Sequence, residues 1–363
     1  MMIWMTYTGS YLKVSKMEDD KITFVTGCRR IDKIRNPLLS AGINLNIIDY
    51  LEFKKQSFSQ IRFLHKLLKT VPGSKVLLSD RESHYLFLTL FIGKIMRIPV
   101  LLRPRGNKIL EKKFKAEYFL EGRRYGKAFF YYFLTYLNSF LFNFVDGFIP
   151  VSEHLAKQIT KNKRYVVVHT PIDFKRFEES NGKEKTLLSV TIFDNPLKVA
   201  ALEYFIKKYH TFLKANGLTL YVAGGGHLFE STKNKYGSYE SITFLGYVDK
   251  IEALYQESKV FLHFSYFDAY PSVVNEAQAN RLPVIVNDCC GMIEQVDDGE
   301  DGFIISLDDE EKMIEKITLL VKSDKLVSSM GEKGFKKVHS SNNTKKIGER
   351  LKEAIAYLLD ERG

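Results

Sequence analysis

The chain has 363 residues, of which 45% are hydrophobic and 27% charged, as in a folded globular protein with room for two domains. The three cysteines, Cys28, Cys289 and Cys290, lack disulfide or zinc spacing, which argues against a disulfide scaffold and suits a reducing compartment. The first residues show no basic segment followed by an apolar run and a cleavage site. We therefore expect no secretory signal and a cytoplasmic location.

The net charge of +11 is concentrated in the first half of the chain. Residues 1–180 hold 31 Lys and Arg against 16 Asp and Glu, whereas residues 181–363 hold 23 against 27. This asymmetry indicates a polyanionic partner for the first half. An anionic membrane surface is the favoured candidate and nucleic acid is the less favoured one. Solvated charge without any partner is the plain alternative.

In the first half, short apolar strands alternate with helical patterns, which predicts an α/β domain with a parallel sheet. The pattern lapses after Asp173 into a charged, glycine-containing segment, 175–185, which we interpret as a linker. The first domain is therefore expected at 1–174. Its strands are expected at 3–8, 22–26, 45–48, 76–78, 100–102, 147–151 and 165–169.

The segment 128–145, AFFYYFLTYLNSFLFNFV, carries no charge over 18 residues. This length is at the edge of what a membrane span requires, but the segment contains polar residues and leads straight into a predicted strand. A buried or interfacial helix fits better. The preceding residues, 111–127, are basic and aromatic, which suggests peripheral docking on a membrane. A helix of the ordinary core is the open alternative.

The second half restarts the alternation and predicts a second domain at 175–344. Its strands are expected at 187–191, 219–223, 242–244, 260–264, 284–287 and 302–305, with helices at 199–216, 250–256 and 272–280. The last residues, 345–363, contain an amphipathic helix. We expect two Rossmann-like domains whose parallel sheets face a central cleft, with ligands outside the carboxyl ends of the strands.

The most informative stretch runs from 265 to 305. Asp268 stands eight positions before Glu276, with the turn 269–271 between them and a helix predicted from Ser272. A helix N-terminus offers unpaired N–H groups and the positive end of a dipole to a diphosphate, and carboxylates on either side could accept hydrogen bonds from hydroxyl groups. The spacing of the two acids alone would be ordinary. The informative feature is the ordered string of strand, acid, proline turn, helix with Glu, strand, Gly-x-x-Glu and Asp-Gly.

This string resembles the donor-site signature of glycosyltransferase family 4, the retaining GT-B enzymes also called glycosyl transferases group 1. Further similarity lies in Val-Asp-Gly-Phe-Ile-Pro-Val-Ser-Glu at 145–153, in Val-Val-His-Thr-Pro-Ile-Asp-Phe at 167–174, and in the segments 220–226 and 244–248. The resemblance covers most of 145–305, whereas the first 140 residues match only in overall rhythm. In such proteins the last helix crosses back to the first domain, and 345–363 is placed to do so.

The resemblance implies a nucleotide sugar as co-substrate. It assigns Glu276 to the ribose, Asp268 to the donor sugar and Lys198 to the diphosphate, as the catalytic residues. Asp268 stands where the family more often has a glutamate, and the arginine that usually precedes the lysine is missing at 191–193. The donor-binding candidates are Gly224, Gly225, Tyr247, Val248, Tyr270, Pro271, Ser272 and Val273.

The family often has His-Gly after the strand at 100–102, where this chain has Arg105 and Gly106. Arg103 and Arg105 would suit an anionic acceptor, or would form structural ion pairs. His84 is a further candidate on the acceptor side, although a lone histidine at a helix start is more often structural. No metal-binding Asp-x-Asp or His/Cys cluster is present, so we expect neither a metal nor another cofactor.

The resulting prediction is a retaining, metal-independent glycosyltransferase that moves a hexose-type sugar from a UDP- or GDP-linked donor to a glycan or lipid-linked acceptor. Such a protein would be cytoplasmic or peripheral on the cytoplasmic face of a membrane. The rival is a non-catalytic scaffold of the same fold that binds a membrane or polyanion through its basic first half. Turnover of a nucleotide sugar distinguishes the two.

Overall fold

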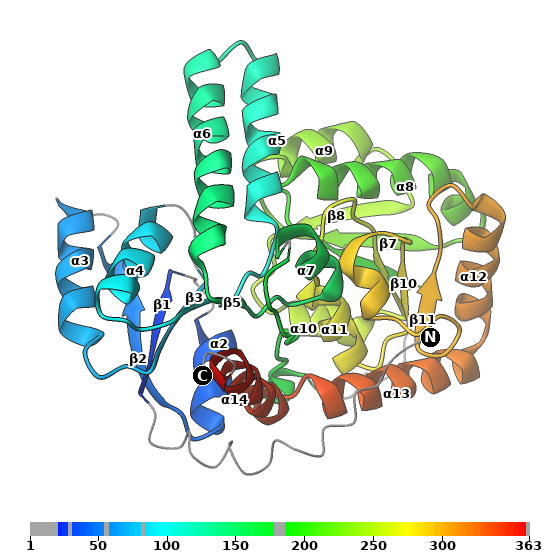
Figure 1. Ribbon diagram of the computed structural model, residues 1–363. Coiled ribbons are helices and arrows are strands. Elements are labelled where there is room, and N and C mark those ends of the chain that lie inside the picture. Colours follow the sequence, from blue (N-terminus) through cyan, green and yellow to red (C-terminus); the bar gives the residue numbers. More distant parts are fainter. Residues whose placement is uncertain are drawn as a thin grey trace. The chain divides into compact units, whose positions relative to one another are not determined.

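The computed structural model describes residues 21–27, 31–53, 58–80, 84–160, 162–177 and 186–360 (Figure 1). The chain divides into two units, which we call unit 1 and unit 2. Unit 1 comprises residues 1–171 and 344–363, and unit 2 comprises residues 172–343. Each unit is built on its own parallel sheet.

The sheet of unit 1 has the strand order β2-β1-β3-β4-β5, and every neighbouring pair is parallel. The predicted strand 3–8 lies outside the described residues. The predicted strand 165–169 forms an isolated bridge, from Tyr165 to Phe148, beside the short strand β5. The strands are β1 (Lys21–Thr26), β2 (Asn44–Asp49), β3 (Val76–Ser79), β4 (Val100–Leu102) and β5 (Gly147–Phe148).

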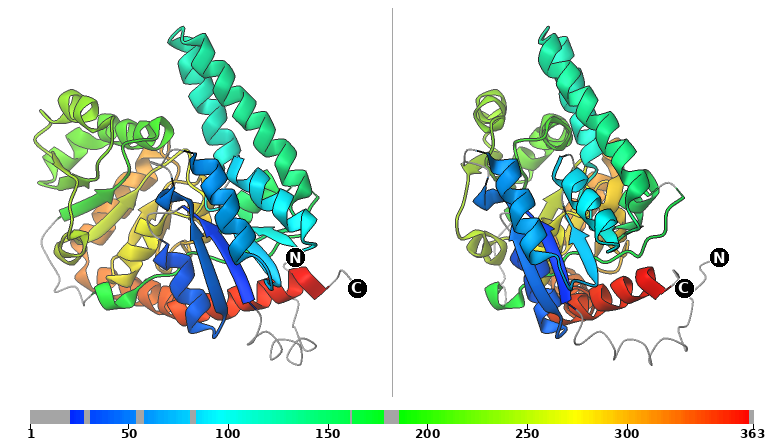
Figure 2. Two further views of the ribbon diagram at one scale, coloured as in Figure 1. Left: turned by 90° about the vertical axis from the view of Figure 1, so that its left-hand side faces the viewer. Right: turned by 60° about the vertical axis from the view of Figure 1, so that its left-hand side comes forward.

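The central strands of this sheet are apolar on both faces, as expected for a parallel sheet covered by helices. Its helices are α2 (Asp32–Ser40), α3 (Ser59–Thr70), α4 (His84–Ile95), α5 (Lys108–Glu121), α6 (Tyr125–Leu141) and α7 (Glu153–Ile159). The last helix, α14 (Thr344–Asp360), packs on α2 of the same unit (Figure 2). Gly348 permits this close approach, because a Cβ there would lie 2.1 Å from the carbonyl oxygen of Pro37.

Helices α5 and α6 pack side by side as a hairpin that extends beyond the sheet of unit 1 (Figures 1 and 2). Asn107 caps α5 by accepting a hydrogen bond from the Leu110 amide at 2.9 Å. The rings of Phe119 and Tyr131 stack between the helices, with centroids 5.5 Å apart. In the described part of the chain, no helix combines the length and the apolarity that crossing a bilayer requires.

The sheet of unit 2 has the strand order β11-β10-β9-β6-β7-β8, again parallel throughout. All the strands expected in this half are present. They are β6 (Thr186–Val190), β7 (Thr219–Ala223), β8 (Ile242–Gly246), β9 (Val260–His263), β10 (Val284–Val286) and β11 (Gly302–Ile304). The helices are α8 (Pro196–Ala215), α9 (Phe229–Tyr236), α10 (Ile251–Glu257), α11 (Ser272–Ala279), α12 (Glu310–Lys322) and α13 (Asp324–Ser341).

The order of the strands reverses between β6 and β9, which are neighbours in the sheet. From β6 the chain moves to β7 and β8 on one side, and from β9 it moves to β10 and β11 on the other. Helix α8 packs in one apolar cluster and helix α11 packs in another. The two clusters contain alternate residues of the strands, so the two helices lie on opposite faces of the sheet. The loops that leave β6 and β9 therefore flank the point at which such sheets bind ligands.

Candidate functional site

The loops after β6 and β9 bring a lysine and an aspartate into contact. Asn195 caps α8 by accepting from the Leu197 amide at 3.0 Å, and Pro196 occupies the first turn, so the helix begins just before Lys198. The Lys198 ammonium lies 2.8 Å from each carboxylate oxygen of Asp268. Lys198 and Asp268 are 70 positions apart in the sequence and were both assigned to the donor. They meet where the strand order reverses.

A histidine that the sequence analysis missed completes this group. His263 ends β9 with 2% of its surface exposed, and its Nε2 lies 3.3 Å from Asp268 Oδ2. Burial works against ionisation of Asp268, but Lys198 and His263 outweigh it and hold the pKa of Asp268 below its ordinary value. The available signal was a single polar residue at the carboxyl end of an otherwise apolar strand, Val-Phe-Leu-His.

The first turn of α11 follows directly on the Asp268 loop. Pro271 occupies the N-cap position and supplies no side-chain cap, so the first N–H groups of the helix, at Ser272 and Val273, have no intrahelical acceptor. Gln295 fixes this helix start, because its Nε2 donates to the Pro271 carbonyl at 3.0 Å and to Asn275 Oδ1 at 2.7 Å. The neighbouring Tyr270 is largely buried.

Glu276 lies one turn inside α11 and is 6% exposed. The hydroxyl of Tyr255, on α10, donates to its Oε2 at 3.3 Å. Burial and the Glu276 carboxylate together raise the pKa of Tyr255 well above its usual range, so this phenol stays protonated and can keep donating. The contact holds the Glu276 carboxylate in one orientation.

Glycines form the loop that leaves β7. Gly224 has φ +141°, and a Cβ there would lie 1.8 Å from the Thr191 carbonyl oxygen, so only glycine fits. The Phe193 amide donates to the Gly225 carbonyl at 3.0 Å, and the Gly224 amide donates to the Gly246 carbonyl at 2.8 Å. These bonds join the loops after β6, β7 and β8.

Tyr247 and Val248 follow β8, and the Tyr247 side chain is 79% exposed. The donor-binding candidates of unit 2 thus all lie at the carboxyl edge of one parallel sheet, on the loops after β6, β7, β8 and β9. We therefore treat this edge of the sheet as the candidate site.

Residues that follow β10 hold the loop after β9 in place. Asn287 accepts a hydrogen bond from the Ser265 amide at 2.9 Å and donates another to the Ser265 carbonyl at 3.1 Å. The Gly291 amide donates to the Asp268 carbonyl at 3.0 Å. Cys289 and Cys290 next to it are free thiols. Asp268 is therefore positioned through its backbone as well as through its side chain.

In unit 1, Arg103 is 1% exposed and lies inside the fold. Its guanidinium donates to three backbone carbonyls, those of Ile149 at 3.4 Å, Val168 at 3.1 Å and His169 at 3.1 Å. Burial, with help from the nearby Arg105, lowers the pKa of Arg103 to about 9. This placement favours the structural alternative for Arg103 over contact with an acceptor.

Arg105 is the more accessible of the two arginines, with 29% of its side chain exposed, and it lies 3.9 Å from Asp80 at the end of β3. The Thr26 hydroxyl, at the end of β1, donates to the same carboxylate at 3.0 Å. The sheet of unit 1 reverses its order between β1 and β3, so these groups mark its own switch point. A Cβ added to Gly106 would meet open space. His84 begins α4, but its side chain lies outside the described residues.

Among the residues described, no group of three or more His, Cys, Asp or Glu side chains is placed to hold a metal ion. The acidic side chains of the candidate site are instead engaged with Lys198, His263 and Tyr255. Lys198, whose ammonium has N–H donors beyond its contact with Asp268, and the amides of the first turn of α11 are donors that an anionic ligand can use.

Comparison with known proteins bears out the resemblance to glycosyl transferases group 1 for the second half of the chain. Residues 172–337 match the family model described as Glycosyl transferases group 1. The chain is 26% identical over 201 residues to N,N'-diacetylbacillosaminyl-diphospho-undecaprenol alpha-1,3-N-acetylgalactosaminyltransferase of Campylobacter jejuni, covering 51% of this chain and 54% of that protein. It is 29% identical over 121 residues to the capsular polysaccharide biosynthesis glycosyltransferase CapM of Staphylococcus aureus, covering 33% of this chain and 32% of that protein. The chain thus spans about half or less of the length of these curated relatives.

The fold is confirmed over nearly the whole chain. The crystal structure of Anabaena Alr3699/HepE in complex with UDP matches 93% of this chain and 100% of its own, with a TM-score of 0.68 and 14% sequence identity. The predicted fold class is therefore correct: the protein has a GT-B fold of two Rossmann-like units, each with a parallel sheet.

The contacts of the two arginines in unit 1 predict different effects of substitution. Arg103→Met leaves three backbone carbonyls without their donor, and we expect it to lower the free energy of unfolding of unit 1 by about 2–4 kcal/mol. Arg105→Met, the comparison variant, removes a partly exposed side chain whose ion pair is long, at 3.9 Å, and is expected to lower it less, by about 1 kcal/mol. Urea titration followed by circular dichroism measures both. Equal stability of the two variants would contradict the structural role of Arg103.

The lowered pKa of Asp268 predicts a pH-dependent contribution to stability. A carboxyl whose pKa is lower in the folded state stabilises the protein fully above its unfolded pKa of about 3.9, and loses this contribution as the pH falls towards the folded value. Wild type should therefore exceed Asp268→Asn in unfolding temperature at pH 6–7, with the gap closing below about pH 4. Asp249→Asn, an exposed carboxyl of the same unit, controls for net charge. A gap independent of pH would refute the assigned ionisation.

Proposed function

We propose that this protein is a retaining, metal-independent glycosyltransferase that moves a hexose-type sugar from a UDP- or GDP-linked donor to a glycan or lipid-linked acceptor. The observation that carries the proposal is the position of the Lys198–Asp268 pair beside the uncapped start of α11, at the switch point of the sheet in unit 2. This arrangement offers positive charge and free amides to a diphosphate, with fixed carboxylates beside it.

The diphosphate of the donor would bind Lys198 and the amides of Ser272 and Val273. Helix N-termini favour anions, because the first N–H groups and the helix dipole both point to the ligand. A lysine ammonium has three N–H donors and can hold a phosphate oxygen while it keeps its contact with Asp268. These groups supply the cationic environment that the missing arginine would otherwise strengthen.

The two carboxylates would hold the ends of the donor that carry hydroxyl groups. Glu276, oriented by Tyr255, would accept hydrogen bonds from the ribose. Asp268 would accept hydrogen bonds from the transferred sugar, and it stays ionised because Lys198 and His263 lower its pKa against the effect of burial. Tyr247 and Val248, after β8, would lie on the side of the nucleobase.

During transfer, negative charge develops on the departing diphosphate. Lys198 and the α11 amides are already in place and stabilise this charge without rearrangement. Retention of configuration is carried over from the family resemblance, and no nucleophilic side chain is assigned. We therefore propose a front-face reaction in which the leaving phosphate accepts the proton of the acceptor hydroxyl while the new glycosidic bond forms. Metal independence rests on the sequence, which has no Asp-x-Asp at a strand end.

Two relatives support the type of donor and acceptor. The Campylobacter jejuni protein is named for a diphospho-undecaprenol acceptor, and the structure of Anabaena HepE is a complex with UDP. A lipid-linked acceptor also agrees with the basic character of residues 1–180, since such an acceptor carries a diphosphate. Arg105 is the candidate of unit 1 for that anion.

The second candidate function is a non-catalytic scaffold that binds a membrane or polyanion through its basic half. The missing arginine at 191–193 favours it, and the clustered Lys198 and Asp268 argue against it. The scaffold requires no affinity for a nucleotide sugar, so donor binding separates the two candidates.

The proposal predicts that one nucleotide raises the unfolding temperature of the protein. A thermal-shift screen would use UDP, GDP, ADP and their sugar conjugates, each with EDTA and with Mg²⁺. Ligand at 100 times its Kd stabilises the folded state by about 2.7 kcal/mol. We expect a shift with UDP or GDP that EDTA leaves intact, a larger shift with one sugar conjugate, and turnover of that conjugate.

Two variants test whether the nucleotide that raises the unfolding temperature binds at the candidate site. Glu276→Ala should abolish the nucleotide shift, whereas Glu311→Ala, an exposed glutamate of the same unit, should leave it unchanged. Stabilisation by no nucleotide at millimolar concentration would overturn the proposed function and favour the scaffold. A shift that requires Mg²⁺ would refute metal independence alone.

A further inference from the structure

Helix α6 presents its apolar side to solvent and its less apolar side to the fold. The buried positions are Ala128, Thr135, Asn138 and Leu141, which are mostly small or polar. Between 54% and 75% of the side-chain surface is exposed at four aromatic residues of the same helix: Phe129, Phe133, Tyr136 and Phe140. Their spacing of four, three and four residues places them in a single stripe along the helix. A helix of an ordinary core has the opposite arrangement.

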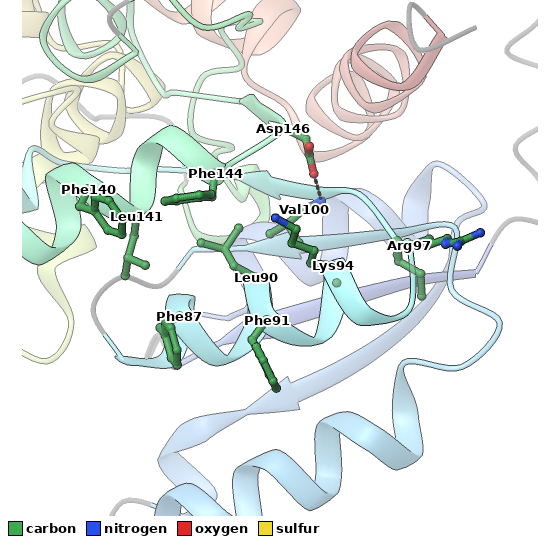
Figure 3. A pocket seen from close by; sticks show the side chains of 12 residues that line it. Phe87, Leu90, Phe91, Lys94, Arg97, Val100, Phe140, Leu141, Phe144 and Asp146 are labelled. Atoms are coloured by element: carbon green, nitrogen blue, oxygen red, sulfur yellow. Dashed lines mark hydrogen bonds between the residues drawn. The ribbon is translucent and has the colours of Figure 1, made fainter.

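The stripe continues onto α4 of the same unit. Phe144, after the end of α6, is 48% exposed, and Phe87 and Phe91 on α4 are each 50% exposed, with their rings stacked. Phe140 and Phe144 line a pocket of about 540 Å³ together with Phe87 and Phe91 (Figure 3). We call these rings and the α6 stripe the α4–α6 aromatic surface; it comprises Phe87, Phe91, Phe129, Phe133, Tyr136, Phe140 and Phe144.

Cations stand at both ends of this surface. Arg123 and Arg124 form the turn that precedes α6, and Lys94 and Arg97 line the pocket at the other end (Figure 3). All four side chains are exposed, and none of them forms an ion pair with another described residue. The residues from 128 to 145 carry no charge. An apolar stripe is thus bracketed by unpaired positive charge.

We propose that the α4–α6 aromatic surface binds an anionic phospholipid bilayer, with the four cations on lipid phosphates and one acyl chain in the pocket. Helices that lie in a membrane interface have aromatic residues on one side and Lys or Arg at their borders. Each cation near an anionic bilayer adds to the attraction. Most of the pocket lining is apolar, including Leu90 and Leu141, and suits a hydrocarbon chain. The carboxylate in the lining, Asp146, accepts a hydrogen bond from the Val100 amide at 2.8 Å (Figure 3).

The charge pattern disfavours a second copy of the chain as the occupant. A two-fold interface across this surface would place Arg123 and Arg124 of one copy against cations of the other, whether the helices ran parallel or antiparallel. Like charges in contact oppose such an interface. A bilayer with anionic lipids satisfies both the rings and the cations. The inference needs neither nucleotide nor sugar, so it stands or fails independently of the proposed function.

Flotation with vesicles tests the proposal on the full-length protein. The vesicles contain either phosphatidylcholine alone or 30% phosphatidylglycerol in phosphatidylcholine. We expect wild type to float with the anionic vesicles, less so in 0.5 M salt, and not with the neutral ones. Phe133→Ser/Phe140→Ser should weaken binding at least about tenfold. Arg123→Gln/Arg124→Gln should weaken it about 25-fold.

Matched variants separate the surface from general effects. Leu39→Ser/Leu319→Ser removes two other exposed apolar side chains, 52% and 40% exposed, and should bind like wild type. Leu90→Trp fills the pocket and should weaken binding while leaving the stripe intact. Circular dichroism and unfolding temperature check each fold, and the Arg123→Gln/Arg124→Gln variant carries the test if the phenylalanine variant unfolds.

Three results would overturn the proposal. Wild type that floats with neither kind of vesicle, or equally with both, shows no recognition of anionic lipid. A Phe133→Ser/Phe140→Ser variant that folds and floats like wild type shows that the surface is not used. Analytical ultracentrifugation that finds a wild-type dimer, dissolved by the same variant, shows that a second copy covers the surface.

Discussion

The ion pair between Lys198 and Asp268 is the interaction on which the candidate site depends. It joins the loop after β6 to the loop after β9, the two strands between which the sheet of unit 2 reverses its order. Burying a carboxylate is costly, and the lysine and His263 offset that cost. In the proposed function, the ammonium of Lys198 faces the diphosphate and the carboxylate of Asp268 faces the sugar. The side chains that balance each other's charge in the fold are therefore the ones that the proposed function assigns to the ligand.

The remainder of unit 2 holds this pair in place. Asn287 and the Gly291 amide fix the backbone around Asp268, and Gln295 fixes the start of α11. Gly224, after β7, allows the neighbouring loops to approach within hydrogen-bonding distance, because a Cβ at this position would collide with the Thr191 carbonyl. Preorganisation of this kind allows donors to act on developing charge without moving. Unit 1 differs, because its buried arginine, Arg103, serves the fold.

Much of this could be predicted from the sequence, since buried parallel strands are continuous apolar runs and loops at their carboxyl ends share one edge of a sheet. The family resemblance singled out Lys198, Asp268 and Glu276, and the structure places them on the loops and the helix start at this edge. His263 was missed because it ends an apolar strand, and the direction of Arg103 depends on carbonyls about 46 and 65 residues away. Which face of α6 would be exposed was also beyond prediction. Its sequence has aromatic residues on one side and Ala, Thr and Asn on the other, and the packing of α5 decides the outcome.

The most direct test of the donor site is isothermal titration of UDP and of uridine into wild type and Lys198→Met, with Lys207→Met, an exposed lysine of the same helix, as the control. The account predicts that Lys198→Met weakens UDP binding at least about tenfold, because a charged hydrogen bond to phosphate is lost, and leaves uridine binding unchanged. Lys207→Met should bind both ligands like wild type. Equal affinity of wild type and Lys198→Met for UDP would contradict the assignment of the diphosphate to this pair.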